Sequence, residues 1–179
     1  EINRKELAKL KLDKIKQMGA WLSDMFMPLI DEMERHVMVR IHEEFDDAFK
    51  EWFSMLVEDS LMTARLDDSF SPIVQQNGYE TETQHLSGGE RTACALAYRL
   101  ALNNTVNNLL NTIKTKDLLI LDEPTDGFSA EQLDKMRDVL EQLDLRQIIV
   151  VSHEQKIESF AEKTIRIEKY DHTSRAISV

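Results

Sequence analysis

The chain has 179 residues, 42% of them hydrophobic, which is enough for one ordinary domain with a buried core. Its 33 acidic residues outnumber its 22 basic ones, and a net charge of -11 does not indicate a nucleic-acid-binding surface; contact with DNA would need a local basic face or a partner's. The single cysteine, Cys94, excludes an internal disulfide. The sequence shows no signal peptide and no apolar run of about 18 residues, so neither secretion nor membrane insertion is expected.

Residues 1–57 are predicted to form a coiled-coil stalk and its junction with a globular body. Apolar residues first repeat at steps of three and four, at Ile15, Met18, Leu22, Met25 and Leu29. This is the heptad pattern of a coiled coil, over about two heptads. Pro28 lies inside the pattern and is expected to kink the helix or begin a new one. Because the sequence opens on Glu1 in mid-pattern, we expect it to be cut from something longer.

Beyond residue 29 the apolar residues follow at steps of four, at Met33, Val37, Ile41, Phe45, Phe49 and Phe53. Such a stripe drifts around a helix of about 3.6 residues per turn. The drift predicts a helix that leaves a coiled coil and meets a globular body. The side chains expected to pack there are Trp52, Phe53, Met55, Leu56 and Val57. Core packing is favoured over a cofactor site for these side chains.

Residues 58–179 are predicted to form an α/β lobe. The expected strands are 61–66, 70–76, 118–121 and 147–152, and the expected helices are 87–112, 129–143 and 157–163. Residues 165–168 and 176–179 are expected to pair as a terminal hairpin. The apolar runs 118–121 and 147–152 predict strands buried on both faces. The alternation of strands and helices is typical of a parallel sheet with crossover helices, and Ser129 and Gln132 are spaced as a capping box.

The most specific segment is 86–91, which reads LSGGER directly before the helix 87–112. Its glycines let backbone amides turn toward an anion, and the start of the helix adds the positive end of its dipole. Ser87 adds a hydroxyl donor. The segment therefore suits a terminal phosphate of a nucleotide, although an ordinary loop with a helix N-cap explains these six residues equally well.

An acidic pair, Asp122 and Glu123, follows the apolar run 118–121. The carboxyl ends of parallel strands face the crevice in which α/β sheets bind ligands. Asp122 is suited to hold Mg²⁺, directly or through water, and Glu123 to accept a proton from an attacking water. A strand that ends in a solvated acidic turn is the alternative interpretation.

His153 ends the second apolar run, 147–152. An imidazole there can hydrogen-bond a γ-phosphate oxygen and help to place the water. The other four histidines are interpreted as structural. Ser87 precedes Asp122 by 35 residues (122−87), and His153 follows Asp122 by 31 (153−122). The three features gain force together because each stands at a strand end or a helix start.

The sequence nowhere contains the Gly-x-x-x-x-Gly-Lys-Ser/Thr loop that cradles the α- and β-phosphates. We therefore expect that the chain neither binds ATP tightly nor hydrolyses it alone. A companion segment is expected to carry that loop and to complete the sheet.

These segments resemble the ABC-type ATPases of the SMC superfamily. Residues 86–91 are similar to the ABC signature motif, 118–123 to the Walker B strand with its catalytic glutamate, 125–129 to the D-loop and His153 to the switch histidine. A coiled-coil arm that leads into such a half-domain is typical of the superfamily, whose N-terminal lobe carries the Walker A motif. The run DEPT at 122–125 resembles the ATPase of the DNA double-strand-break repair complex, which partners a Mn²⁺-dependent nuclease and tethers DNA ends.

The resemblance implies that two heads sandwich two ATP molecules with Mg²⁺. It assigns nucleotide contacts to Ser87, Gly88, Gly89, Glu90 and Asp126. It assigns Mg²⁺ to Asp122, general-base catalysis to Glu123 and γ-phosphate sensing to His153. The D-loop of the family usually has a Leu-Asp pair after Pro-Thr, whereas residues 126–129 here read DGFS, with Asp126 as the candidate to take over.

Arg91 and Arg99 are eight residues apart and share one face of the helix 87–112. The family uses such arginines to couple ATP-driven closure to movement of the stalk; surface salt bridging is the alternative. The implied partners are an N-terminal Walker A lobe, a second ATPase head, a repair nuclease at the coiled-coil base and double-stranded DNA. The nuclease contact is expected around residues 25–39, and the protein is expected in the cytoplasm with the nucleoid, or in the nucleus.

Three other functions compete with this interpretation. A chromosome-structuring SMC head or a related recombination ATPase shares the chemistry and differs in its partner. A transporter ATPase subunit shares the two motifs but has no reason for a helical stalk over residues 1–57. A non-catalytic binding module would use the sheet and the stalk only as a scaffold.

Overall fold

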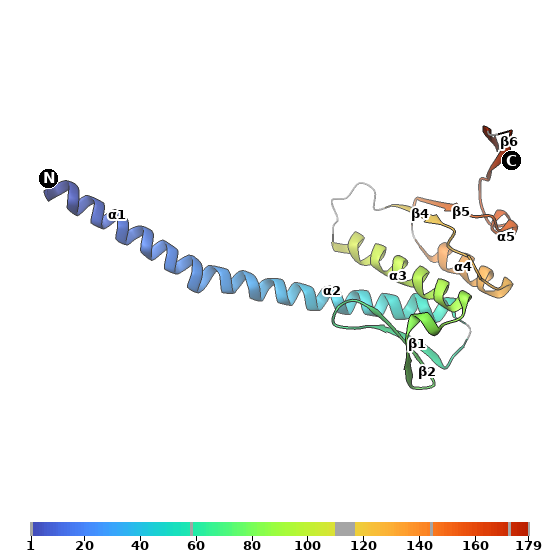
Figure 1. Cartoon of the computed structure of the whole chain (residues 1–179), viewed down its shortest axis with the longest axis horizontal. Helices are drawn as coiled ribbons and strands as arrows, with labels where there is room; N and C mark the ends of the chain where they lie inside the picture. Colours follow the sequence, from blue (N-terminus) through green and yellow to red (C-terminus); the bar gives the residue numbers. More distant parts are fainter. Residues whose placement is uncertain (1, 58, 110–116, 144, 172, 179) are drawn as a thin grey trace. The chain divides into compact units, whose positions relative to one another are not determined.

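The computed structural model describes all residues except 1, 58, 110–116, 144, 172 and 179 (Figure 1). The chain forms two compact units, Glu1–Glu43 and Glu44–Val179. The helices are α1 (Ile2–Trp21), α2 (Met27–Leu56), α3 (Gly88–Leu109), α4 (Ala130–Gln142) and α5 (Gln155–Glu158). The strands are β1 (Met62–Leu66), β2 (Pro72–Gln76), β3 (Tyr79–Thr81), β4 (Leu118–Asp122), β5 (Gln147–Val151), β6 (Ile165–Tyr170) and β7 (Thr173–Ser178). No helix among the described residues is long and apolar enough to cross a membrane.

The predicted stalk is helical from residue 2 to residue 56, and Pro28 does not end it. A π-helical turn, Leu22–Phe26, lies directly before the proline, and the amide of Met27 donates to the carbonyl of Leu22. Proline lacks an amide hydrogen and its ring crowds the carbonyl four residues earlier, so a wider turn just before it relieves the conflict. The described side chains of the first unit are all exposed or half-buried.

The second unit contains the C-terminal part of α2, whose apolar side chains are buried. They are Phe45, Ala48, Phe49, Trp52, Phe53 and Leu56. Two rows with a spacing of four residues form one broad face, which packs in the same core as β1 and α3. The prediction that the helix enters a globular body is confirmed. The compact units divide at residue 43, whereas the predicted junction with the lobe lies at 57, at the end of α2.

Strands β1, β2 and β3 form an antiparallel sheet in that order. Asn77 and Gly78 join β2 to β3 with φ values of 53° and 83°. A two-residue type I′ hairpin turn requires positive φ at both of these positions. The prediction of a strand from residue 70 is wrong at its start. Phe70 has a φ of 62° and lies in the turn before β2, where its amide donates to the carbonyl of Asp67.

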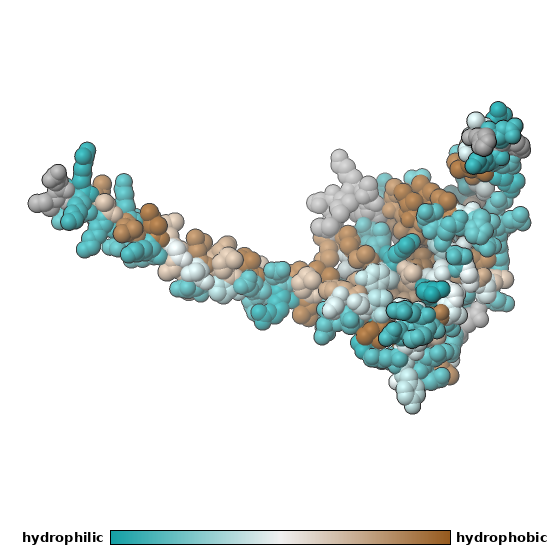
Figure 2. All heavy atoms as spheres, viewed as in Figure 1, coloured by the Kyte–Doolittle hydropathy of each residue, from teal (hydrophilic) through white to brown (hydrophobic). Residues whose placement is uncertain are grey.

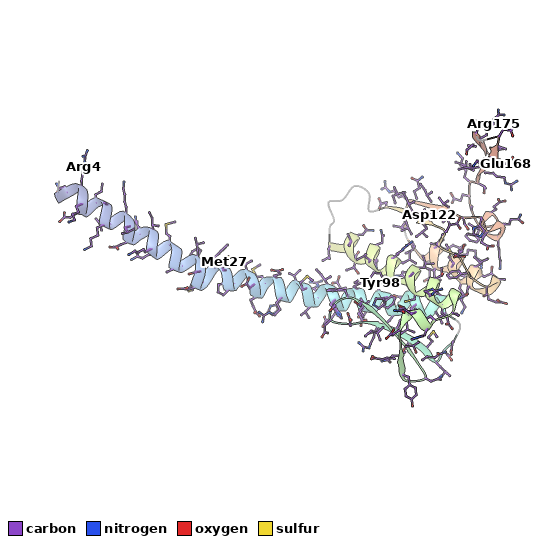
Figure 3. The ribbon with its side chains drawn as sticks, in the orientation of Figure 1. Arg4, Met27, Tyr98, Asp122, Glu168 and Arg175 are labelled. Carbon is purple, nitrogen blue, oxygen red and sulfur yellow. The ribbon has the colours of Figure 1, made fainter. Side chains whose placement is uncertain are left out.

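The signature helix α3 is packed along most of its length. Its buried residues are Ala93, Cys94, Leu96, Ala97, Leu100, Ala101 and Thr105. Burial raises the pKa of the Cys94 thiol to about 11, so this cysteine is a core residue and a poor nucleophile. Tyr98 of α3 is labelled in Figure 3, and its ring centroid lies 5.0 Å from that of Phe45 and 5.9 Å from that of Phe49.

Strands β4 and β5 pair in parallel, and α4 is the crossover helix between them, as predicted. The capping box is also confirmed, because the Ser129 hydroxyl accepts from the Gln132 amide and the Gln132 side chain from the Ser129 amide. Buried residues Leu133, Met136, Val139 and Leu140 line the inner face of α4. The predicted helix 129–143 is therefore confirmed, and α4 is one residue shorter than predicted at each end.

The prediction that these two strands are buried on both faces is wrong. Leu119 and Leu121 are 7% and 1% exposed, whereas Ile120, Ile149 and Val151 are 61%, 40% and 51% exposed. Among the described residues the sheet has these two strands, and α3 and α4 both lie on one side of it (Figure 1). Nothing that the structure describes covers the other side, where Figure 2 shows hydrophobic side chains over β4 and β5.

Strands β6 and β7 form a sheet of their own, separate from β4 and β5. Strand β6 pairs with β7 in an antiparallel hairpin, which confirms the predicted hairpin with longer strands. The expected helix 157–163 is wrong in extent, because the structure forms only the single turn α5, which shares residues 157 and 158 with the prediction. Lys156 of α5 donates to Asp134 of α4 at 2.8 Å, and this bond lowers the pKa of the aspartate below its ordinary value.

Candidate functional site

The acidic pair and His153 meet at the carboxyl edge of the parallel sheet. The strand register places Asp122 beside Val151, so the residues that follow each strand lie next to one another. The Glu123 amide donates to the Val151 carbonyl at 2.8 Å, and one Glu123 carboxylate oxygen lies 2.9 Å from Nδ1 of His153. Asp122, labelled in Figure 3, and Glu123 are both exposed. The two proposed catalytic side chains therefore come from adjacent strands and are in contact.

The backbone of Glu123 is held in an unusual conformation. Its φ of 44° lies in the left-handed region, which a residue with a Cβ adopts only when its surroundings hold it there. Thr125 is 1% exposed, and its hydroxyl lies 3.3 Å from that of Ser152 on the neighbouring strand end. The Ser152 hydroxyl also accepts from the amide of Glu154 at 3.1 Å. Sequence reasoning missed these two hydroxyls, and their position directly after the strand ends was the available signal.

The donor set at this edge fits Mg²⁺ that arrives with a nucleotide. The described residues contain no group of three or more His, Cys, Asp or Glu able to hold a metal ion by themselves. Mg²⁺ commonly binds through one or two carboxylates, water and the phosphates of its substrate. Asp122 offers an exposed carboxylate at a strand end, which meets the protein's share of such a site.

Residues 87–90, called the signature loop below, begin α3 with a second capping box. The Glu90 amide donates to the Ser87 hydroxyl at 3.3 Å, and the Ser87 amide donates to the Glu90 carboxylate at 2.8 Å. The helix-cap interpretation of this loop is therefore right for the unbound chain. The phosphate interpretation is compatible with this cap, because the Ser87 hydroxyl keeps its hydrogen, and Ser87 and Gly88 are exposed.

The two signature glycines have different surroundings. A Cβ built on Gly88 has no atom within 4 Å, so the fold of this chain does not require glycine there. A Cβ built on Gly89 lies 2.6 Å from Oε1 of Gln132 and 2.9 Å from the carbonyl oxygen of Gly127. Glycine at 89 is therefore required by packing against the turn that follows Glu123.

The structure brings the signature loop to the D-loop of the same chain. The Thr92 hydroxyl donates to the carbonyl of Asp126 at 2.7 Å, a contact that sequence reasoning did not find. The Asp126 side chain is exposed. Arg91 and Arg99 are also exposed, and neither side chain has a hydrogen bond or ion pair to a residue that the structure describes. The salt-bridge alternative for these two arginines is thus not seen within the described chain.

Comparison with known proteins tests the resemblance of this chain to the ATPases of the SMC superfamily. No protein-family model matches the chain. Curated proteins named DNA double-strand break repair Rad50 ATPase do match. The protein of Pyrococcus abyssi is 33% identical over 130 residues, which is 72% of this chain, and that of Sulfurisphaera tokodaii is 30% identical over 172 residues, or 91%. The chain belongs to the Rad50/SMC-type ATPases. It spans 14% and 18% of the length of these two relatives, so it corresponds to a small part of them.

Solved structures support the same fold. The Smc head domain with a coiled coil and joint derived from Pyrococcus yayanosii superposes with a TM-score of 0.76 and 22% identity, over 99% of this chain and 35% of that one. The Smc head domain with an extended coiled coil from Pyrococcus furiosus gives a TM-score of 0.71 at 20% identity, over 100% of this chain and 46% of that one. The motifs identify the chain as a C-terminal part of a Rad50/SMC-type head, with an α/β lobe that follows a long helix.

Proposed function

We propose that this chain supplies the signature loop, the catalytic carboxylate and the switch histidine of a dimeric ATPase head. A lobe with a Walker A motif completes each head, and two heads close on two ATP molecules with Mg²⁺. The closed and open states control a nuclease that processes DNA double-strand breaks, and the dimer tethers the DNA ends. Because its substrate would be DNA, we infer that the protein acts in the nucleoid or in the nucleus.

The contact between Glu123 and His153 carries this proposal. A carboxylate that activates water needs a partner that orients it, and the 2.9 Å contact from the adjacent strand provides one. The buried Thr125 and its contact with Ser152 hold the backbone on either side of the pair. We infer that Glu123 takes the proton from the attacking water, that His153 contacts the γ-phosphate, and that Asp122 holds Mg²⁺, which neutralises phosphate charge when bound.

The surroundings of Gly88 support a ligand that approaches from outside the chain. A Cβ built on Gly88 has no described atom within 4 Å, so no contact within the described chain requires glycine there. A close approach by another molecule supplies the missing reason. We infer that Ser87, Gly88 and Gly89 present their amides and hydroxyl to the nucleotide on the opposite head, with Glu90 and Asp126 at the rim of this contact. The Ser87 amide becomes available once the Glu90 carboxylate moves aside.

The open faces of the chain support the proposed partners. The uncovered face of β4 and β5 is apolar, as a surface that receives the Walker A lobe must be. Residues 25–39 expose a run of large apolar side chains, labelled at Met27 in Figure 3, and we infer that the nuclease docks there. The net charge of -11 leaves contact with double-stranded DNA to local basic surface or to a partner. Arg91 and Arg99 are our candidates for coupling head closure to the stalk.

The direct test measures ATP hydrolysis after co-expression of this chain with a Walker A lobe. We expect Glu123→Gln to lower kcat about a hundredfold or more, because the amide cannot accept the proton. The matched control is Glu154→Gln, which removes a neighbouring carboxylate whose Oε1 lies 4.0 Å from Nε2 of the same histidine. The control should retain turnover. Equal turnover of the Glu123→Gln and unsubstituted proteins would exclude this glutamate from catalysis.

The resemblance to solved SMC heads keeps a chromosome-structuring ATPase as the second candidate. The two functions share their chemistry and differ in the protein that binds near the head. Affinity purification of the assembled head from its native source distinguishes them. A bound nuclease supports the repair function, whereas a kleisin-type linker supports the second candidate.

A further inference from the structure

Thr92 makes a hydrogen bond that reaches outside its own helix. It is the fifth residue of α3, and its Oγ1 donates to the carbonyl oxygen of Asp126 at 2.7 Å. A threonine in a helix ordinarily returns its hydroxyl to a carbonyl three or four residues earlier. Here the acceptor is 34 residues later in the sequence, in the turn that follows Glu123. The bond therefore joins two separate segments of the candidate site.

The backbones of the two segments also approach each other closely near this hydrogen bond, at Gly127 on one side and at Gly88 and Gly89 on the other. The left-handed φ of 78° at Gly127 turns the chain toward the signature loop, and a Cβ built on Gly127 would lie 3.4 Å from the carbonyl carbon of Gly88. The carbonyl oxygen of Gly127 would lie 2.9 Å from a Cβ built on Gly89. The two segments thus lie backbone to backbone, and at Gly89 their approach leaves no room for a side chain.

The turn itself is anchored to α4. The side chain of Gln132, which would meet a Cβ on Gly89 at 2.6 Å, accepts from the Ser129 amide at 3.0 Å. The Ser129 hydroxyl accepts from the Gln132 amide at 3.1 Å. The start of α4 therefore lies directly against the signature loop at Gly89.

We propose that Thr92 is a positioning residue that locks the signature loop, residues 87–90, to the turn 126–129. The inference rests on the head dimer proposed above. In that dimer the signature loop faces the nucleotide on the opposite head, while the turn continues directly from the Glu123 that acts on the head's own nucleotide. The lock makes these elements move as one body, so that binding at one site sets the geometry of the other.

A hydroxyl that only stabilises the fold would behave differently. Its loss would reduce the active fraction and kcat but would leave the dependence of the rate on ATP concentration unchanged. A lock between the two sites also sets the Hill coefficient for ATP, because that coefficient measures how strongly the two sites influence each other. The Hill coefficient therefore separates the two roles.

The test compares four variants of the full chain assembled with its Walker A lobe. Thr92→Val removes the hydroxyl at nearly constant shape, Thr92→Ala is a second removal, and Thr92→Ser restores the hydroxyl. Thr105→Val is the matched control, because Thr105 lies on the same helix, is 2% exposed and has a hydroxyl with no hydrogen-bond partner among the described residues. The measurements are the ATP dependence of hydrolysis and amide hydrogen exchange of segments 87–90 and 126–129 without nucleotide.

We expect Thr92→Val and Thr92→Ala to bring the Hill coefficient toward one and to lower kcat about fivefold, as the loss of one hydrogen bond allows. Hydrogen exchange should rise in both segments together. Thr92→Ser and Thr105→Val should resemble the unsubstituted protein in every measurement. An unchanged Hill coefficient in the two removal variants, with or without a lower kcat, would overturn the proposal.

Failure of the proposed function is a different result. It would appear as an unsubstituted assembly that does not hydrolyse ATP, or whose turnover does not depend on Glu123. The exchange measurement still tests the lock in that case, because it needs no nucleotide. Unchanged exchange in both segments of Thr92→Val and Thr92→Ala would then overturn it.

Discussion

The two ends of α2 carry similar apolar side chains in opposite surroundings. In the first unit, up to Glu43, Met33 and Val37 are 56% and 51% exposed. In the second unit, Phe49 and Leu56 are 0% exposed. The sequence pattern is apolar at both ends of one continuous helix. The difference teaches that an apolar stripe indicates that a face will be covered, without indicating whether the same chain covers it.

Strand β4 repeats this contrast on a smaller scale. Leu121 is 1% exposed against the core, and Ile120, one residue earlier, is 61% exposed. Adjacent residues of a strand point to opposite faces, so one short apolar run serves two surfaces. The core face is satisfied within the chain, and the outer face is left for a partner. Figure 2 shows exposed hydrophobic side chains over β4 and β5 and along the stalk helix.

The largest expected effect breaks the contrast within α2. Phe49→Ala should lower the free energy of unfolding by about 3 to 5 kcal/mol, because it empties a fully buried position. Met33→Ala should change it by less than about 0.5 kcal/mol, since the side chain is exposed. Denaturant unfolding followed by circular dichroism measures both. Similar losses for the two variants would show that the first part of α2 is also covered.

A smaller expected effect sharpens the contrast within β4. Leu121→Ala should cost about 2 to 4 kcal/mol of unfolding free energy in the chain alone, whereas Ile120→Ala should cost less than about 0.5 kcal/mol. Binding of a Walker A lobe to the outer face should make Ile120→Ala costly as well. The measurement is unfolding with and without that lobe. An Ile120→Ala variant that remains neutral in the assembled head would show that the Walker A lobe does not cover the outer face of β4.

The smallest expected effect concerns the two signature glycines. Gly89→Ala should cost about 1 to 2 kcal/mol of unfolding free energy, because its Cβ overpacks against the Gly127 carbonyl. Gly88→Ala should be within about 0.5 kcal/mol of neutral, because its Cβ enters open space. In ATP-dependent head dimerisation, measured by light scattering, Gly88→Ala should be impaired despite its normal stability. Normal dimerisation of that variant would remove the close approach inferred at Gly88.

Local patterns predicted most of the elements. Heptad spacing predicted the helix over residues 1–57, the glycine loop predicted the start of α3, and Ser129 with Gln132 predicted the capping box. These predictions succeed because each depends on interactions within a few residues. The errors arose at Phe70, whose left-handed φ no local pattern announces, and at α5, whose single turn was expected to be longer.

The candidate site was predicted in its parts and not in its contacts. Sequence reasoning named Glu123 and His153 separately, and it missed the hydroxyls of Thr92, Thr125 and Ser152. Their contacts join residues 27 to 34 positions apart, and only the folded chain decides which of these distant groups meet. The nucleotide roles of all site residues stay predictions.

The sequence by itself determined most of the helices and strands, the order of the motifs and the absence of a Walker A loop from these 179 residues, because periodicity, turn residues and spacing are properties of the linear chain. Tertiary structure alone decided which apolar faces are covered. It also decided that the signature loop contacts the turn after Glu123, because burial and hydrogen bonding between distant residues depend on how the elements pack. The exposed sides of β4 and α2 show this division most plainly, since their sequences resemble core and their surroundings are open.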